Sequence, residues 1–227
     1  MDGTYLTQLR TGALSGAATD ILAKKDSKNF LIIGTGGQAL TQVEAVLEIR
    51  NIEKLFVCDL DIDRAKEFKK KISEKYPDLE IKAIDNANDY IEDMDIITTV
   101  TTSKKPVFEA TNLKKGTHIN SVGSYTPDMQ ETPAEVLEKA DKIFLDTIDG
   151  VMNESGDVIN PIKEKIVEKE KVEHELGDLI NNKESGREND EEITWFKTTG
   201  SAVVDIVVAE KIYKKAMEKN LGSFIEL

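Results

Sequence analysis

The chain has 227 residues and a formal net charge of −13, from 30 basic and 43 acidic side chains. This acidic excess repels phosphate backbones and anionic lipid surfaces, so neither nucleic acid nor a membrane is an expected partner. The sequence has no apolar run long enough to span a bilayer and no signal-peptide pattern, and its single cysteine excludes an internal disulfide. A cytoplasmic protein of one domain, or one and a half, is expected.

The first predicted element is a helix over residues 4–24, with apolar side chains on one face at Leu6, Leu9, Ala13, Ala17, Ile21 and Leu22. Six strands then alternate with helical patterns, over residues 29–34, 54–59, 80–84, 95–101, 116–123 and 142–146. Near-continuous β-branched runs separated by helices predict an α/β fold with a doubly wound parallel sheet covered on both faces.

The C-terminal part is patterned differently. Residues 181–190 are polar and are expected to form a solvated loop, and residues 193–196 have the composition of a short strand. A long helix is predicted over residues 201–220, where apolar side chains again recur at helical spacing.

A glycine-rich turn follows the first strand in "FLIIGTGGQALTQVEAVLEI", residues 30–49. Gly34 suits a tight turn, Gly36 suits close approach of the backbone to a pyrophosphate, and Ala39 is small enough for the helix to pack on the strand. The start of the helix would offer N–H groups to the negative charge. The strand before the turn and the helix after it favour a dinucleotide site. A βαβ turn without a ligand is the alternative.

Asp59 supports the dinucleotide interpretation, because it ends the next strand 20 residues after Ala39. A carboxylate there can accept hydrogen bonds from a ribose 2′-OH. Leu60 stands where a protein that binds a 2′-phosphate often has a basic residue, although Arg64 lies one helical turn further on. NAD(H) is therefore favoured over NADP(H).

Small polar residues gather at the ends of the fourth and fifth strands, at Thr98, Thr99, Thr101, Thr102, Ser121, Gly123 and Ser124. Strand ends face the same crevice as the glycine turn, although each of these residues is also ordinary in a strand. His118 is expected to be a packed strand residue, and His174 is expected to face solvent on a charged helix. Two separated histidines and one cysteine, Cys58, which is expected to be inert packing, do not favour a metal site.

Eight segments in order resemble the ornithine cyclodeaminase/μ-crystallin family of NAD(P)-dependent enzymes, and the resemblance covers essentially the whole chain. The segments are "LRTGALSGAATDILA" (9–23), "IIGTGGQA" (32–39), "DIITTVTTSKKPVF" (95–108), "GTHINSVGSYTPDMQE" (116–131), "ESGD" (154–157), "ELGDLI" (175–180), "GREND" (186–190) and "FKTTGSAVVD" (196–205).

The resemblance implies a role for particular positions. The pyrophosphate would be held by Gly36, Gly37 and Gln38, with Gly34 in the turn, and the adenosine ribose by Asp59. The remaining cofactor contacts would be made by Thr101, Val122, Gly123, Ser124 and Thr198. Arg10 would reach both the cofactor and the substrate carboxylate, and a guanidinium can bind a carboxylate through two hydrogen bonds. From its pattern alone, Arg10 would pass for a surface residue of a helix.

The chain departs from the family pattern in two places. Ornithine cyclodeaminases have an aspartate for proton transfer where this chain has Tyr125, so an imine reductase or amino-acid dehydrogenase is favoured over a cyclodeaminase. A tyrosine phenol can act as a general acid. Family members also have the first half of a substrate lobe before the "RTGA" helix, and we expect this chain to lack it, with Met1 at an internal position of the family pattern.

We expect a Rossmann-type dinucleotide-binding domain over residues 25–192. Residues 1–24 and 193–227 would form the helical remainder of an incomplete substrate and dimerisation lobe, with a homodimer when that lobe is whole. The resemblance implies hydride transfer at the α-carbon of a small amino or imino acid, in either direction. The alternative is a non-catalytic NAD-binding fragment, or a subunit that another polypeptide completes.

Overall fold

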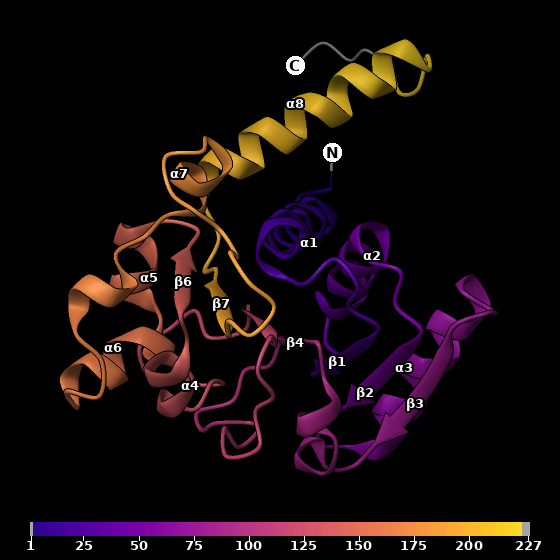
Figure 1. Cartoon of the computed structure of the whole chain (residues 1–227). Coiled ribbons are helices and arrows are strands. Elements are labelled where there is room, and N and C mark those ends of the chain that lie inside the picture. Colours follow the sequence, from indigo (N-terminus) through magenta and orange to yellow (C-terminus); the bar gives the residue numbers. More distant parts are fainter. Residues whose placement is uncertain (1, 224–227) are drawn as a thin grey trace.

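A seven-stranded parallel sheet forms the centre of residues 2–223, the part of the chain that this computed structural model describes (Figure 1). The strands are β1 (Asn29–Ile33), β2 (Lys54–Cys58), β3 (Glu80–Ile84), β4 (Ile96–Thr99), β5 (His118–Ser121), β6 (Lys142–Leu145) and β7 (Thr194–Lys197). Their spatial order is β3-β2-β1-β4-β5-β7-β6. The doubly wound α/β prediction is confirmed, because the order reverses beside β1.

Both faces of the sheet are buried. Along β1, Phe30 and Ile32 belong to one apolar cluster, whereas Leu31 and Ile33 belong to the other. This alternation follows from the two-residue period of a strand, and it needs helices on each side.

His118 is completely buried between Thr194 and Asn120, and burial lowers its pKa to about 3. Its prediction as a packed strand residue is confirmed.

The long helices lie where they are expected: α1 (Gly3–Leu22), α2 (Ala39–Ile49), α3 (Ile62–Lys75) and α8 (Ala202–Glu218). Between β3 and β4 the chain forms two 3-10 turns, η1 (Ala87–Asp89) and η2 (Ile91–Asp93). Unforeseen short elements cover the second half of the sheet: α4 (Ala134–Lys139), α5 (Ile148–Glu154), α6 (Gly156–Lys163), η3 (Lys169–Val172) and α7 (Leu176–Ile180). The placement of His174 on a charged helix is wrong: it lies between η3 and α7, paired with Glu184.

Helix α1 packs mainly through small residues, and of the predicted apolar face only Leu22 is buried. Its buried residues are Thr11, Gly12, Ser15, Gly16, Ala18, Thr19 and Leu22. A Cβ at Gly12 would lie 2.6 Å from the Thr41 carbonyl oxygen, and one at Gly16 would lie 3.3 Å from Ala45 Cβ. The two glycines therefore let α1 approach α2 closely.

Strand β7 lies inside the sheet, between β5 and β6, with Trp195 opposite Ile119 and Ile143. The sheet therefore extends past residue 192, where the dinucleotide-binding domain was expected to end. The reason is that pairing with both neighbours supplies the hydrogen bonds of a buried strand, so residues 194–197 belong to the sheet and not to a helical remainder.

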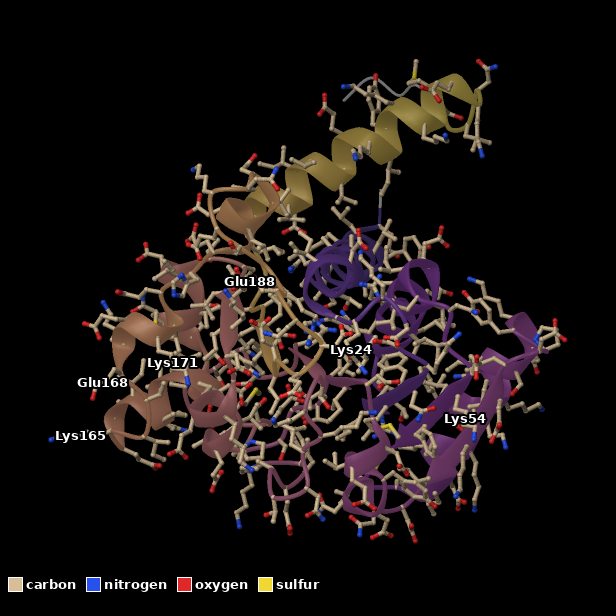
Figure 2. The ribbon with its side chains drawn as sticks, viewed as in Figure 1. Lys24, Lys54, Lys165, Glu168, Lys171 and Glu188 are labelled. Carbon is tan, nitrogen blue, oxygen red and sulfur yellow. The ribbon has the colours of Figure 1, made fainter. Side chains whose placement is uncertain are left out.

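Helix α8 projects away from the sheet and none of its residues is buried (Figure 1). Apolar side chains are exposed along it, with Val203 68% and Ile206 70% exposed. An ion pair between Arg10 and Asp205 joins α8 to α1. Charged side chains are exposed elsewhere, and Figure 2 shows Lys165 and Glu168 directed outward at the left of the view. No helix within residues 2–223 has both the length and the apolar character needed to cross a membrane.

Candidate functional site

The carboxyl ends of neighbouring strands line up across the sheet, with Ile33 opposite Thr99, Thr99 opposite Ser121 and Ser121 opposite Lys197. Loops that follow β1, β4 and β5 therefore meet at one edge. In open α/β sheets, ligands bind at this edge where the strand order reverses. A pocket of about 500 Å³ lies there, lined by Thr4, Thr7, Gln8, Gly36, Gly37, Gln38, Val100, Thr101, Thr102, Val122, Gly123 and Tyr125.

The glycine loop forms one wall of this pocket. Gly34 has φ of +103°, and a Cβ there would lie 2.7 Å from the Val100 carbonyl oxygen, so the turn requires glycine. A Cβ at Gly36 would meet nothing within 4 Å, which leaves open space over that backbone. The side-chain oxygen of Gln38 is buried without a hydrogen-bond partner, and α2 begins at the next residue. An open backbone cradle at a helix N-terminus fits a pyrophosphate.

Asp59 lies outside the pocket lining, beside the glycine loop. Its Oδ2 accepts hydrogen bonds from the backbone N–H (2.9 Å) and the hydroxyl (2.5 Å) of Thr35, and its Oδ1 accepts from the Asp61 N–H (3.2 Å). Burial raises the pKa of Asp59, but these hydrogen bonds and the charge of Arg64 outweigh it, so the pKa is lowered overall. The carboxylate is thus ionised and fixed, while neighbouring Leu60 is fully exposed. Its contact with a ribose stays a prediction.

The opposite wall comes from the loops after β4 and β5. Thr101, Val122 and Gly123 line the pocket, and Tyr125 lines it with half of its surface exposed. Their contacts with a cofactor or substrate stay predictions. The Ser124 side chain does not line it: its hydroxyl donates to the Met129 carbonyl oxygen and lies 3.0 Å from the Ser155 hydroxyl.

Arg10 and Thr198 also lie outside the pocket lining. The Nε of Arg10 donates to Asp205, its guanidinium packs against Gly200, and its Nη1 is buried without a partner. Thr198 is buried, and its hydroxyl donates to Asp146 at 2.6 Å. The unpartnered Nη1 of Arg10 keeps its two N–H donors available for an anion. The cofactor and substrate contacts of both residues stay predictions.

Two groups of residues at this site were missed from the sequence. The first turns of α1 contribute Thr4, Thr7 and Gln8 to the pocket. Behind the far wall, the buried Glu131 carboxylate accepts hydrogen bonds from the backbone of Thr101 and Gly123. The sequence offered one indication of Glu131: it is the last residue of the segment 116–131, which resembles the family pattern.

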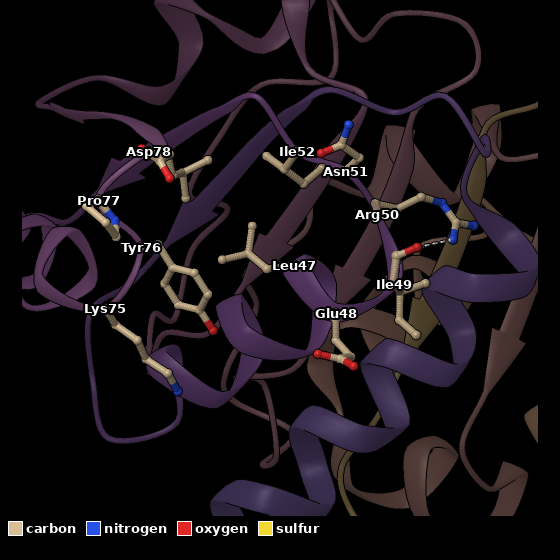
Figure 3. A pocket seen from close by; sticks show the side chains of 11 residues that line it. Leu47, Glu48, Ile49, Arg50, Asn51, Ile52, Lys75, Tyr76, Pro77 and Asp78 are labelled. Carbon is tan, nitrogen blue, oxygen red and sulfur yellow. Dashed lines mark hydrogen bonds between the residues drawn. The ribbon is translucent and has the colours of Figure 1, made fainter.

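A larger hollow lies at the other edge of the sheet, between the C-terminal ends of α2 and α3 (Figure 3). It is lined by residues such as Leu47, Arg50 and Tyr76, which lie near the N-terminal ends of the strands. In this architecture ligands bind at the C-terminal ends of the strands, on the opposite side of the sheet. The buried Arg50 guanidinium there donates its hydrogen bonds mostly to backbone carbonyl oxygens, among them that of Thr19.

Cys58 is buried and burial raises its pKa to about 11, in agreement with its prediction as inert packing. Within residues 2–223, no three His, Cys, Asp or Glu side chains are grouped so that they could hold a metal ion.

Comparison with known proteins gives relatives along the whole chain. A Δ(1)-pyrroline-2-carboxylate reductase of Bacillus cereus is 43% identical over 226 residues, which are 100% of this chain and 69% of the relative. The structure of Thermococcus litoralis Δ(1)-pyrroline-2-carboxylate reductase, in complex with NADH and L-proline, superposes with a TM-score of 0.94 at 43% identity, over 99% of this chain and 69% of that one.

An archaeal alanine dehydrogenase, described as a dimer with bound NAD, superposes with a TM-score of 0.89 at 35% identity, over 100% of this chain and 69% of that one. These relatives are named as enzymes, so the comparisons give no support to the non-catalytic alternative. The sequence pattern of the ornithine cyclodeaminase/mu-crystallin family matches residues 1–220. The chain belongs to the ornithine cyclodeaminase/mu-crystallin family.

Proposed function

We propose that this chain carries the chemistry of an NAD(H)-dependent imine reductase, which reduces the C=N bond of a small cyclic imino acid such as Δ(1)-pyrroline-2-carboxylate. The observation that supports this most is the likeness to the Thermococcus litoralis reductase, whose structure is described with NADH and L-proline. The pocket at the strand ends is consistent with it, because the residues of the glycine loop and those of the β4 and β5 loops share one cavity.

The residues present fit a dinucleotide. The open backbone at Gly36 and Gly37, the backbone of Gln38 and the N–H groups at the start of α2 would hold the pyrophosphate. The ionised Asp59 would accept from the ribose hydroxyls, and Leu60 offers no charge to a 2′-phosphate, so NAD(H) is preferred. The cofactor, when bound, supplies the hydride.

The other tasks belong to the side chains of the chain itself. The unpartnered Nη1 of Arg10 would bind a substrate carboxylate, while Asp205 orients the guanidinium. Tyr125 borders the pocket and would donate a proton to the substrate nitrogen through its phenol. Thr101, Val122 and Gly123 would shape the nicotinamide side of the cavity, with Ser124 contributing through its backbone. Thr198, which lies outside the pocket lining, would contact the bound cofactor.

The test is turnover of Δ(1)-pyrroline-2-carboxylate by the purified protein, followed by the loss of NADH absorbance. Tyr125→Phe should lower kcat by about 100-fold, the lower end of the usual contribution of a general acid, with the NADH Kd unchanged. Absence of turnover by the wild-type chain would reject the activity, and full activity of the phenylalanine variant would reject the role of Tyr125.

Alanine dehydrogenation is a second candidate, favoured by the likeness to the archaeal enzyme at 35% identity. It differs in using an acyclic substrate and in releasing ammonia. Assays with pyruvate plus ammonium and with the cyclic imine, at equal NADH, separate the two: the higher kcat/KM identifies the activity.

The described dimer of the alanine dehydrogenase relative supports a further proposal, that this chain forms a homodimer. Exposed apolar side chains on α8 are consistent with burial in an assembly. We also propose a division of the chain into the dinucleotide-binding sheet, now including β7, and a second unit to which α8 contributes. Sedimentation of the purified chain tests the first proposal, and limited proteolysis between β7 and α8 tests the second.

A further inference from the structure

Three charged side chains are completely buried behind the pocket wall: Glu131, Asp157 and Lys197. The Glu131 carboxylate joins two loops. Its Oε1 accepts a hydrogen bond from the Thr101 N–H, in the loop after β4. Its Oε2 accepts from the N–H groups of Gly123 (2.5 Å) and Ser124 (3.0 Å), in the loop after β5.

The other two charges hold Glu131 in place. Asp157 of α6 accepts hydrogen bonds from the N–H groups of Glu131 (2.7 Å) and Thr132 (2.9 Å) through Oδ1, and its Oδ2 lies 3.2 Å from the Lys197 Nζ of β7. Among the described residues, these are the charged groups that face Glu131 from the neighbouring elements. Two carboxylates against one ammonium leave one uncompensated negative charge in the interior, which is costly.

We propose that Glu131 is a positioning residue: its ionised carboxylate fastens the Thr101 loop to the Gly123 loop and so sets the width of the pocket on the nicotinamide side. The proposal rests on the proposed NAD(H) function. Both fastened loops line the pocket, whereas Glu131 itself lies behind them, so it acts through their backbone and not on a ligand.

Protonation of Glu131 would weaken this link. An ionised carboxylate accepts from all three N–H groups, but a protonated one places an O–H against an N–H donor on one side. Burial, together with the charge of Asp157, raises the pKa of Glu131 to about 7, against the opposing effect of Lys197. The link is therefore complete above neutral pH and loosened below it, and cofactor binding should tighten as the pH rises.

The only tryptophan gives a readout that needs no cofactor. Trp195 is buried, and its indole N–H donates to the Ser121 hydroxyl, which lies 2.6 Å from the Thr132 hydroxyl. The backbone N–H of Thr132 in turn donates to Asp157, so the indole adjoins the network. In the wild-type protein without NADH, Trp195 fluorescence should change with a midpoint near pH 7.

Four proteins are compared: wild type, Glu131→Gln, and the matched controls Asp128→Asn and His174→Gln. Asp128 is an exposed residue of the segment 116–131, which also contains Glu131. The pKa of the Asp128 carboxyl is lowered to about 2, mainly by its pairing with Lys104. His174 is a partly exposed histidine, and its replacement removes the side-chain type that most often titrates near neutral pH. The buried His118 does not titrate in this range, because its pKa is about 3.

From about pH 6 to about pH 8 the wild-type NADH Kd should fall about fivefold, the worth of one hydrogen bond. Glu131→Gln should bind as weakly as wild type at the lower pH, show no pH dependence and lose the Trp195 transition. Both controls should keep the wild-type profiles. A purely structural role of Glu131 would lower Tm but leave these profiles without a midpoint near neutral pH.

The proposal is overturned by a wild-type Trp195 signal that is flat across neutral pH, by loss of the transition in His174→Gln, or by an unchanged pH profile in Glu131→Gln. If Glu131→Gln does not fold, the wild-type and His174→Gln titrations decide. If wild type binds no NADH at any pH, the proposed function fails, and the cofactor-free titration still decides whether Glu131 couples to the strand ends.

Discussion

The two walls of the pocket are built on different principles. The glycine loop at residues 34–38 is held by hydrogen bonds to the end of β2, with the Gly34 N–H bonded to the Cys58 carbonyl oxygen at 2.8 Å and the Asp59 carboxylate accepting from Thr35. The opposite wall is held by a buried charge, because Glu131 joins two loops that follow different strands.

This difference separates binding from stability. On the glycine side, Gly36 and Gly37 leave open space for a ligand, so substitutions at these two positions should change binding and spare the fold. On the Glu131 side the residues that shape the pocket also compensate buried charge, so substitutions there should change both. The predictions below test this division, beginning with the largest effect.

Lys197→Met should destabilise the protein by about 3–5 kcal/mol, the usual cost of removing one partner of a buried ion pair, because Asp157 and Glu131 would lose their compensating cation. Urea unfolding followed by Trp195 fluorescence measures this. The control is Lys142→Met on the neighbouring edge strand, whose partner Glu188 is exposed and whose loss should cost under about 1 kcal/mol. Equal effects of the two substitutions would contradict the role of the buried cluster.

Gly36→Ala should weaken NADH binding by about 30-fold, or about 2 kcal/mol, by placing a methyl group where the pyrophosphate approaches. Its free energy of unfolding should stay within about 0.5 kcal/mol of wild type, because that Cβ meets no other atom within 4 Å. Fluorescence titration and urea unfolding measure the two quantities. An alanine variant that binds NADH normally would remove Gly36 from the site.

Asp59→Ala should raise the NADH Kd about tenfold, through loss of the acceptor for the ribose hydroxyls and of the carboxylate that orients Thr35. Thr35→Val separates the two causes, since it removes only the orienting hydroxyl. Isothermal titration of both variants with NADH and NADPH measures them, and an equal loss for the two cofactors in Asp59→Ala would reject the ribose role.

Leu60→Arg should have the smallest effect. An exposed arginine beside the ribose site would improve NADPH affinity by about fivefold, or about 1 kcal/mol, with stability unchanged. Leu60→Gln is the uncharged control. If both variants respond alike, charge at position 60 does not choose the cofactor.

Most of the first half of the fold could be predicted from the sequence. Each strand there is a run of apolar residues, and each long helix repeats its apolar residues over several turns. The glycine loop was recognisable for the same reason, since its residues are consecutive. The short helices α4 to α7 were missed, because five to eight residues, in α6 interrupted by Pro161, carry too little periodicity.

The far wall of the site could not be predicted, because its parts come together only in space. Glu131, Asp157 and Lys197 come from three separate segments, and no local pattern indicates that a lysine in a strand will pair with a buried carboxylate. The contribution of α1 was hidden likewise: its close approach to α2 depends on Gly12 and Gly16, which hydrophobic periodicity does not count.

The position of β7 has a consequence for the order in which the protein is made. Strands β5 and β6 are not neighbours, and the gap between them is filled by the last strand of the sheet to leave the ribosome. The half from β3 to β5 can assemble early in synthesis, whereas β6 has no sheet partner until residues 194–197 emerge. Lys197 arrives with them, so the wall that depends on Glu131 is completed last. In refolding experiments β7 must still join β5 to β6, so Trp195 should become buried in the same phase in which NADH binding appears.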